Sequence, residues 1–229
     1  MSASVYRDIF GPGSRLESRF IEDYDRLKEV IDSLRSIDPT IRVVLVLGTY
    51  DLLHIGHARY MERCKELGDV VLVAVDTDAA VRKAKGSNRP IVPQEERVEM
   101  LTHLRHVDLV TLVHDYSEKG LWTYGLIKNY IRPDTIVISH RPPSDEIHIK
   151  EVEPYCGQVV VLDSQAQTST SAKIRLLMVD FATTIKSAIE SLDIPGNLAR
   201  AIDTIVDPSS IAEVPKDESE HTTKGGSKW

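Results

Sequence analysis

Two histidines and the glycine between them are the residues of this chain best suited to chemistry. His54, Gly56 and His57 follow an apolar run at residues 41–47 by way of a short turn. If a helix begins near His54, its first N–H groups direct partial positive charge at the turn, and both imidazoles can reach one anion. Gly56 has no side chain to hold that anion away. The spacing therefore predicts a phosphate site, although two histidines on one helix are more often a surface pair or a metal site.

The stretch from residue 48 to residue 57 resembles the signature G-x-[FY]-D-x-x-H-x-G-H of the cytidylyltransferase-like nucleotidyltransferases. The matching residues are Gly48, Tyr50, Asp51, His54, Gly56 and His57. The resemblance extends over residues 41–175. It implies that His54 and His57 are catalytic. It also implies that the nucleotide is bound by Gly48, Thr49, Tyr50, Asp51 and Gly56.

A second part of the resemblance lies between residues 75 and 97. A Lys-Gly, an Arg-Pro and a Glu-x-Arg in this segment are similar to those of heptose-phosphate adenylyltransferases and archaeal flavin-adenine-dinucleotide synthetases. The resemblance implies that Lys85 and Arg97 act on the phosphates and that Lys83 helps to bind the nucleotide. Asp76 or Asp78 could position the acceptor or a magnesium ion. The same residues could instead form a solvated charged loop and ordinary helix caps.

A cluster of hydroxyl residues at 168–171 is similar to the second phosphate-binding segment of the family. Hydroxyls and N–H groups at a helix start can hold the β- and γ-phosphates. The residues that we expect to do so are Ser169, Thr170 and Ser171. Ser and Thr are also common helix caps without any ligand. Residues 165–167 read Gln-Ala-Gln where glycerol-phosphate cytidylyltransferases carry Arg-Thr-Glu-Gly, which weakens an assignment to that branch.

The pocket for the base is expected around residues 136–141, at the end of a late strand. Ser139 is predicted to contact the nucleotide there, and Arg141 to contact the acceptor or the triphosphate. Arg141 could equally be a surface residue of an irregular loop. Relatives of the heptose and flavin types often carry a Gly-rich stretch here, whereas this chain has Ser-His-Arg-Pro-Pro. The identity of the base therefore stays open.

The elements that must position these residues alternate along the chain. Apolar runs predict strands near 41–47, 69–75, 107–113, 134–139 and 157–162. Helical spacing predicts helices near 56–67, 94–105, 119–131 and 145–153. Such alternation is typical of an α/β fold with a doubly wound parallel sheet, Rossmann-like and covered on both faces. Ligands of such sheets collect beyond the carboxyl ends of the strands, where the histidine turn is expected.

Amphipathic helices are expected on either side of this core. We predict an N-terminal extension with one helix over residues 1–40 and a nucleotidyltransferase domain over 41–175. C-terminal helices are expected over 176–207, the first of them from about residue 171 to 192, and a disordered tail over 208–229 because large apolar residues are nearly absent there. The amphipathic helices favour a homodimer.

Composition narrows the class of protein. The 229 residues are 41% hydrophobic and 28% charged, with a formal net charge of -7, which argues against a protein that coats nucleic acid. Cys64 and Cys156 are too few for a disulfide framework and favour a reducing compartment. No apolar stretch approaches the roughly 20 residues that a membrane span needs. We expect a cytoplasmic enzyme without a membrane or nucleic-acid partner.

The expected activity is transfer of a nucleoside monophosphate from an NTP to a phosphorylated sugar, polyol or similar small metabolite, with release of pyrophosphate. ATP is favoured ahead of CTP. Mg2+ carried mainly by the NTP is the expected cofactor, without a dedicated metal site in the protein. The alternatives are a flavin or coenzyme adenylyltransferase, and a non-catalytic protein that senses nucleotides.

Overall fold

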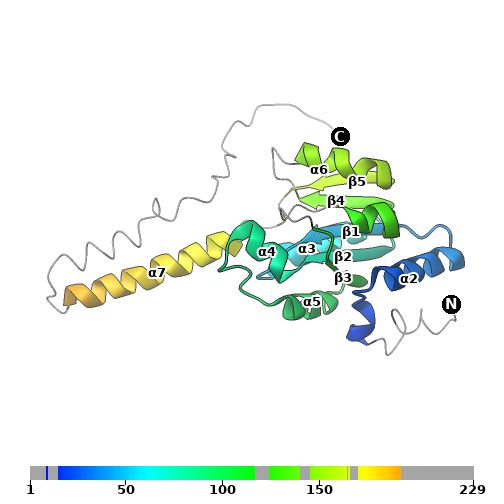
Figure 1. Ribbon diagram of the computed structural model, residues 1–229. Helices are drawn as coiled ribbons and strands as arrows, with labels where there is room; N and C mark the ends of the chain where they lie inside the picture. Colours follow the sequence, from blue (N-terminus) through cyan, green and yellow to red (C-terminus); the bar gives the residue numbers. More distant parts are fainter. Residues whose placement is uncertain are drawn as a thin grey trace, which may run out of the picture. The chain divides into compact units, whose positions relative to one another are not determined.

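A five-stranded parallel sheet forms the core of residues 1–167, the first of two compact units (Figure 1). The computed structural model describes Ile9 and residues 15–116, 124–139, 145–163, 165 and 170–191. The strands are β1 (Val43–Gly48), β2 (Val70–Asp76), β3 (Leu109–Val113), β4 (Thr135–Ser139) and β5 (Gln158–Leu162). They are ordered β3-β2-β1-β4-β5, and every neighbouring pair is parallel. The predicted doubly wound sheet is thereby confirmed.

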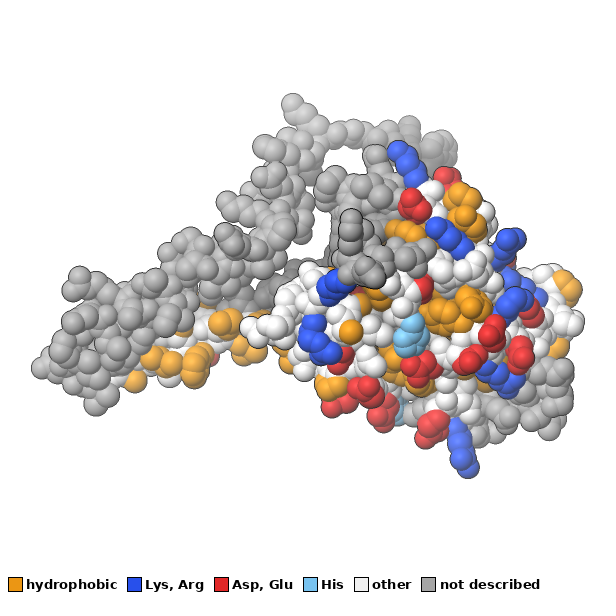
Figure 2. Space-filling view, in the orientation of Figure 1, with side chains coloured by type: hydrophobic (Ala, Val, Ile, Leu, Met, Phe, Trp, Pro, Cys, Tyr) orange, Lys and Arg blue, Asp and Glu red, His pale blue; other side chains and the backbone are white. Residues whose placement is uncertain are grey.

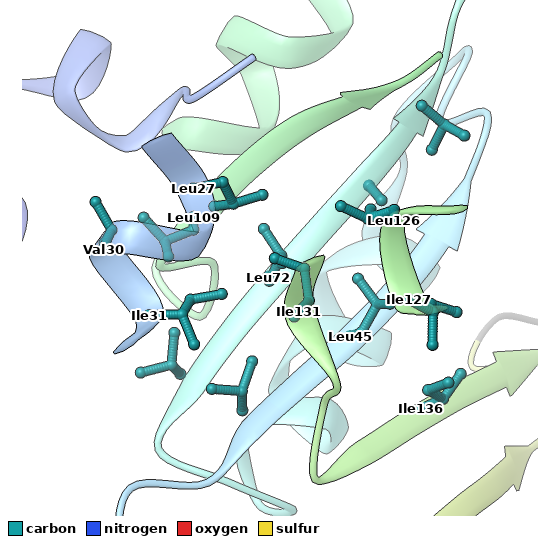
Figure 3. Packing of buried hydrophobic residues seen from close by; sticks show 14 of the residues in the cluster. Leu27, Val30, Ile31, Leu45, Leu72, Leu109, Leu126, Ile127, Ile131 and Ile136 are labelled. Atoms are coloured by element: carbon teal, nitrogen blue, oxygen red, sulfur yellow. The ribbon is translucent and has the colours of Figure 1, made fainter. Parts of the chain in front are cut away.

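The strands read as continuous apolar runs because both faces of the sheet are covered. On one face, alternate strand residues such as Leu45 and Leu72 pack with α2 (Tyr24–Ile37) and η2 (Leu126–Ile131), a π-helical turn. Figure 3 shows side chains of both elements directed at the strands. The other residues of the same strands face α3 (Ile55–Lys65) and α5 (Gln94–Thr102). Burying each such side chain contributes about 1.5–3 kcal/mol, so the two layers hold the carboxyl ends of the strands in a fixed arrangement.

The remaining elements of the core unit are short. Those that the structure describes are η1 (Leu16–Arg19), α4 (Asp78–Lys85), α6 (Asp145–Val152) and η3 (Glu153–Tyr155). Helix α4 occupies a segment that sequence reasoning treated as a loop. Its N-cap is Thr77, whose side chain accepts from Ala80 N–H, and it ends at Gly86 with φ of 94°. The helix expected over 119–131 is described only in its last part, as η2, because residues 117–123 lie outside the described residues.

Within the described residues 15–40, the structure has two elements where one helix was predicted. The structure separates η1 from α2 by an extended stretch in which Phe20 pairs in parallel with Val110 of β3. Ile21 N–H donates to Val110 O at 2.9 Å. Asp23 then caps α2 by accepting from Arg26 N–H at 2.7 Å. The chain breaks its helical pattern here because residues 20–21 extend the sheet at its β3 edge.

Contacts divide the chain into two compact units, residues 1–167 and 168–229. The described part of the N-terminal extension belongs to the first unit and is not a separate appendage. The second unit contains α7 (Thr170–Ser191), close to the helix predicted from residue 171 to 192. Residues 192–229, including the predicted tail, lie outside the described residues. None of the described helices combines the length and apolar character that a membrane crossing requires.

Candidate active site

The histidine motif lies where strand order changes direction. From β1 the chain proceeds to β2 and β3 on one side, whereas β4 and β5 lie on the other. The carboxyl end of β1 at such a reversal is the usual ligand site of an open parallel sheet. The turn that follows Gly48 leads to His54, which is the N-cap of α3. Helix α3 therefore begins at the position predicted from the motif.

Backbone hydrogen bonds orient both imidazoles. Gly56 N–H donates to His54 Nδ1 at 3.1 Å, and His54 N–H donates to His57 Nδ1 at 3.2 Å. A ring nitrogen that accepts a hydrogen bond carries no proton, so each neutral ring has its proton on Nε2. The ring centroids lie 4.0 Å apart with the planes inclined by 35°. The turn thus presents two neighbouring Nε2–H donors, which suits an anion better than a metal ion.

These bonds correct one expectation about the helix start. The N–H groups of Gly56 and His57 are not open to a ligand, because His54 accepts both, through Nδ1 and through its carbonyl oxygen at 2.9 Å. The capping box uses the donors that a phosphate would otherwise occupy. An anion at this turn would therefore meet the imidazoles rather than these two N–H groups.

Gly48 and Tyr50 lie in the segment that leads from β1 to the histidines. The Tyr50 side chain is buried, and its ring meets that of His57 edge to face at 5.6 Å and 67°. A Cβ on residue 48 would come within 3.1 Å of the Tyr50 ring. Tyr50 also has a φ of 53°, which few residues other than glycine adopt. Both residues were predicted to bind the nucleotide; in the structure Tyr50 packs on the His57 ring and Gly48 leaves room for the Tyr50 ring.

Asp51 points into the protein and organises the segment before α5. Its Oδ1 accepts from Ile91 N–H at 2.8 Å and from Val92 N–H at 2.9 Å. Its Oδ2 lies 3.1 Å from an Arg89 guanidinium nitrogen. The residue is 7% exposed. Asp51, predicted as a nucleotide ligand, fastens the stretch after α4 to the histidine turn.

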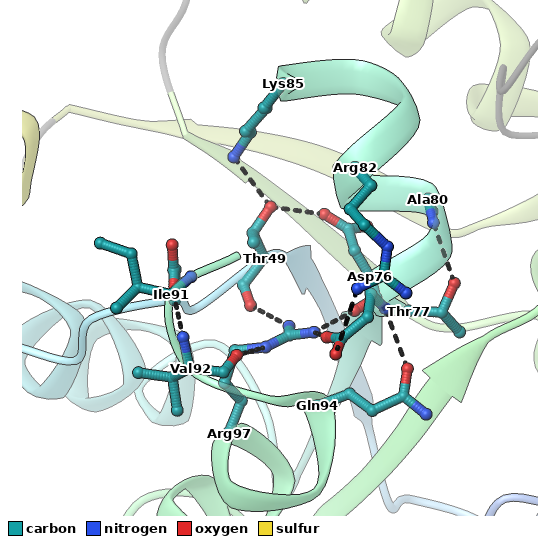
Figure 4. A network of polar contacts seen from close by, with 12 residues as sticks. Thr49, Asp76, Thr77, Ala80, Arg82, Lys85, Ile91, Val92, Gln94 and Arg97 are labelled. Atoms are coloured by element: carbon teal, nitrogen blue, oxygen red, sulfur yellow. Dashed lines mark hydrogen bonds and ion pairs between the residues drawn. The ribbon is translucent and has the colours of Figure 1, made fainter. Parts of the chain in front are cut away.

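Arg97 has a role that differs from the one the resemblance implied. Its side chain is fully buried and donates to three carbonyl oxygens, those of Thr49, Asp76 (2.9 Å) and Val92 (3.0 Å). It also donates to Asp78 Oδ1 at 2.7 Å. Figure 4 shows the guanidinium enclosed by these groups. Arg97 and Asp78, expected at the phosphates and the acceptor, join the ends of β1 and β2 to α5.

Lys85, at the end of α4, reaches the turn that follows β1. Its Nζ donates to Thr49 Oγ1 at 2.9 Å, and Thr49 Oγ1 donates to Asp76 Oδ2 at 2.7 Å (Figure 4). The lysine side chain is exposed, whereas Asp76 is half-buried. The structure thus brings Thr49, Asp76 and Lys85 together beside the histidine turn, where a cation can meet an anionic ligand.

Tyr116 is a residue that sequence reasoning missed. Its hydroxyl donates to Asp76 Oδ1 at 2.5 Å. Burial and the nearby Asp76 carboxylate raise the pKa of the Tyr116 phenol, so it stays a proton donor. Its position just beyond β3, at the carboxyl edge of the sheet, is the feature that could have identified it as a site residue.

Of the other predicted site residues, the described part of the first unit contains Lys83 and Ser139. Lys83 is an exposed residue of α4, and Ser139 ends β4 with a half-buried side chain. Arg141 and Ser169 lie outside the described residues, and Thr170 and Ser171 begin α7 in the second unit. Figure 2 shows acidic and basic side chains interspersed on the visible face of the core unit.

Metal binding by side chains alone finds no support in the described ranges. They contain no group of three or more His, Cys, Asp or Glu side chains that could hold a metal ion. Mg2+ commonly keeps several waters and takes one or two carboxylates plus substrate phosphates. Asp76 is a carboxylate near the turn that fits such a limited contribution.

Comparisons with known proteins agree with this geometry. The family model described as Cytidylyltransferase-like matches residues 45–194, well over half of the chain. "Bifunctional protein HldE" from a Nitratiruptor species is 37% identical over 118 residues, which are 52% of this chain and 24% of that protein. The protein of the same name from Hahella chejuensis is 32% identical over 157 residues, 68% of this chain and 31% of that protein. The chain therefore spans less than a third of the length of these relatives.

A solved structure supports the fold alone. The pantoate-beta-alanine ligase of Francisella tularensis superimposes with a TM-score of 0.51 at 13% identity, covering 81% of this chain and 85% of that chain. The match of the family model, the histidine turn and the parallel sheet lead to one assignment. The chain belongs to the cytidylyltransferase-like family of nucleotidyltransferases.

Proposed function

We propose that this protein transfers a nucleoside monophosphate from an NTP to a small phosphorylated metabolite and releases pyrophosphate. The observation that carries the proposal is the pair of Nε2–H donors on His54 and His57, held by backbone N–H groups at the carboxyl end of β1. Lys85 lies beside the same turn through its bond to Thr49. Two fixed neutral donors and one cation match the negative charge of a polyphosphate.

The reaction needs little covalent work from the protein. A phosphate oxygen of the acceptor attacks the α-phosphorus in line, one P–O bond forms, and the bond from the α-phosphorus to the bridging oxygen breaks. The electron pair of that bond leaves with pyrophosphate. A phosphomonoester is already ionised near neutral pH, so the acceptor requires no general base. Positioning and charge stabilisation therefore account for the acceleration.

Residues in and beside the histidine turn have distinct roles in this scheme. His54 and His57 donate through Nε2 to the α- and β-phosphate oxygens as negative charge moves to the leaving group. Lys85 neutralises part of the phosphate charge, and Thr49 keeps its ammonium at the mouth of the turn. Arg97 is a positioning residue, because its hydrogen bonds go to the ends of β1 and β2 and to the neighbouring segment. Asp76 would be the residue to hold a Mg2+ ion carried by the NTP, and that ion would supply neutralising charge to the phosphates.

The finer substrate assignment rests on sequence resemblance. Residues 82–97 resemble heptose-phosphate adenylyltransferases, which favours ATP ahead of CTP and a sugar phosphate as acceptor. Ser139, Arg141 and Lys83 keep their predicted substrate contacts as proposals, as do the hydroxyl residues Ser169, Thr170 and Ser171. A location in the cytoplasm and assembly as a homodimer are proposed on the same footing.

The deciding experiment measures pyrophosphate release with each of the four common NTPs and a panel of phosphorylated sugars and polyols. Product masses identify the acceptor and the transferred nucleotide. We expect one pair to turn over and to lose turnover in His57→Ala. Binding of an NTP without turnover by any pair would instead support a nucleotide sensor.

A further inference from the structure

We propose that α2 is a positioning element of the active site and that it acts through Tyr24 and Tyr116 on Asp76. The inference rests on the proposed function, because it assigns a kinetic consequence to contacts outside the histidine turn. Tyr24 begins α2, and the hydroxyls of both tyrosines meet the strand ends beside the site. No motif of the sequence links this N-terminal helix to the site.

Helix α2 is fixed at two places in the core unit. Its buried face, including Leu27 and Ile31, packs on β3 and η2 at 0–1% exposure (Figure 3). The residues before it extend the sheet, because Ile21 N–H donates to Val110 O at 2.9 Å. These two attachments fix the position of Tyr24 relative to β3 independently of the contacts that its hydroxyl makes.

The Tyr24 hydroxyl lies where the backbone leaves β3. It accepts from His114 N–H at 3.0 Å and lies 3.0 Å from both Leu112 O and Asp115 Oδ1. Burial raises the pKa of Tyr24, so the hydroxyl keeps its single proton and shares it between these two acceptors. The Tyr24 hydroxyl oxygen is thus contacted by three residues at and just after the end of β3, namely Leu112, His114 and Asp115.

Asp115 fastens the same segment on its other side. Its Oδ2 accepts from Leu126 N–H at 3.3 Å, in the first turn of η2. Gly125 lies so close that an added Cβ would come within 3.3 Å of Asp115. The segment from Leu112 to Tyr116 is therefore held between α2 and η2.

Tyr116 extends this arrangement to the site. Its N–H donates to His114 O at 3.0 Å, and its hydroxyl donates to Asp76 Oδ1 at 2.5 Å. Asp76 Oδ2 accepts from Thr49, whose hydroxyl accepts from Lys85. Hydrogen bonds joined through the backbone of residues 114–116 and the Tyr116 side chain therefore connect α2 with the ammonium group proposed to meet the phosphates.

The test is a double-mutant cycle with Tyr24→Phe and Tyr116→Phe. Each change removes one oxygen and keeps the ring, so the edge-to-face contact of Tyr24 with Tyr130 at 5.3 Å stays in place. We expect each single variant to lower kcat/KM about three- to tenfold, which corresponds to the net value of one hydrogen bond. The double variant should lose little more than either single one, because both act on Asp76. Tyr130→Phe is the matched control, with kcat/KM within about twofold of the wild type.

A purely structural role gives a different result. It would lower the thermal midpoint of Tyr24→Phe and leave kcat/KM of the folded variant unchanged. Wild-type kinetics in Tyr24→Phe, or losses that multiply in the double variant, would overturn the proposal.

A second measurement does not depend on activity. Hydrogen exchange of the amides in residues 76–85 and 112–116 should be faster in Tyr24→Phe than in Tyr130→Phe, whereas the amides of α7 should be unchanged. Equal exchange in both variants would refute the link. If the wild type releases pyrophosphate with no pair of substrates, the proposed function fails, and this measurement still decides whether α2 is coupled to Asp76.

Discussion

Replacement of Arg97 separates the role that the structure indicates from the role that the motif implied. In Arg97→Ala the Asp78 carboxylate, 20% exposed, loses an ion-pair partner at 2.7 Å. Three carbonyl oxygens lose their donor at the same time. Breaking a buried ion pair by removing one partner costs about 3–5 kcal/mol. We therefore expect the free energy of unfolding to fall by that amount.

The expected change is large enough to measure directly. For a chain of this size, 1 kcal/mol shifts the thermal midpoint by about 2–4 °C, so the loss corresponds to about 6–20 °C. Circular dichroism during heating records the midpoint, and pyrophosphate release at about 20 °C records turnover. Arg97→Lys keeps the charge but lacks the planar fork of donors, and we expect an intermediate midpoint.

Lys85→Ala is the matched comparison, because this side chain is exposed and its bond to Thr49 ends on a half-buried hydroxyl. Its midpoint should stay close to that of the wild type, within about 0.5 kcal/mol of stability, while turnover or NTP affinity falls. A wild-type midpoint in Arg97→Ala together with a loss of turnover would refute the reasoning. Arg97 would then have to act on the phosphates.

Three further results are expected. His57→Ala should lower turnover by roughly 100-fold or more, the scale for one preorganised donor, while His103→Ala, an exposed residue at the end of α5, should not; equal activities would remove His57 from the mechanism. Burial raises the pKa of the Cys64 thiol from 9.0 to about 12. The contribution of this protonated thiol to the free energy of unfolding is therefore complete below about pH 9 and is lost as the pH rises towards 12. Iodoacetamide at about pH 8 should accordingly modify Cys156 before Cys64, and the reverse order by peptide mass spectrometry would contradict that burial. Phe181, 68% exposed on α7, is expected at a contact between two copies, so Phe181→Glu should convert a dimer into a monomer by sedimentation, and a monomeric wild type would exclude that contact.

The sheet could be predicted from the sequence because a parallel strand buried on both faces leaves a continuous apolar run. Residues 41–47 and 134–139 were such runs, and β1 and β4 lie there. Helix α4 was missed because it has only eight residues and a charged outer face, which a solvated loop shares. The break at Phe20 was also missed, since the pairing with Val110 is a contact between distant parts of the chain.

The sequence predicted the position of the candidate site better than the roles of its individual residues. The spacing of His54 and His57 placed them at the start of α3, and the structure confirms this location. Arg97 differs because a charged residue on a helix reads as exposed, and nothing local in the sequence shows that Asp78 and three carbonyl groups enclose it. Tyr116 was missed for a similar reason, because its hydrogen bond to Asp76 joins two strand ends that only the folded sheet brings together.

The pairing of Phe20 with Val110 has a practical consequence for shortened forms of the protein. A boundary chosen from the motif would begin the chain near residue 41 and remove both this pairing and α2. The β3 border would then offer unpaired peptide groups beside an uncovered apolar surface, a combination that promotes strand addition between molecules. Expression of the isolated catalytic portion should therefore retain the residues from Ile9 onward, because Ile9 is buried in the same core cluster as α2, and shorter versions are expected to accumulate as insoluble protein.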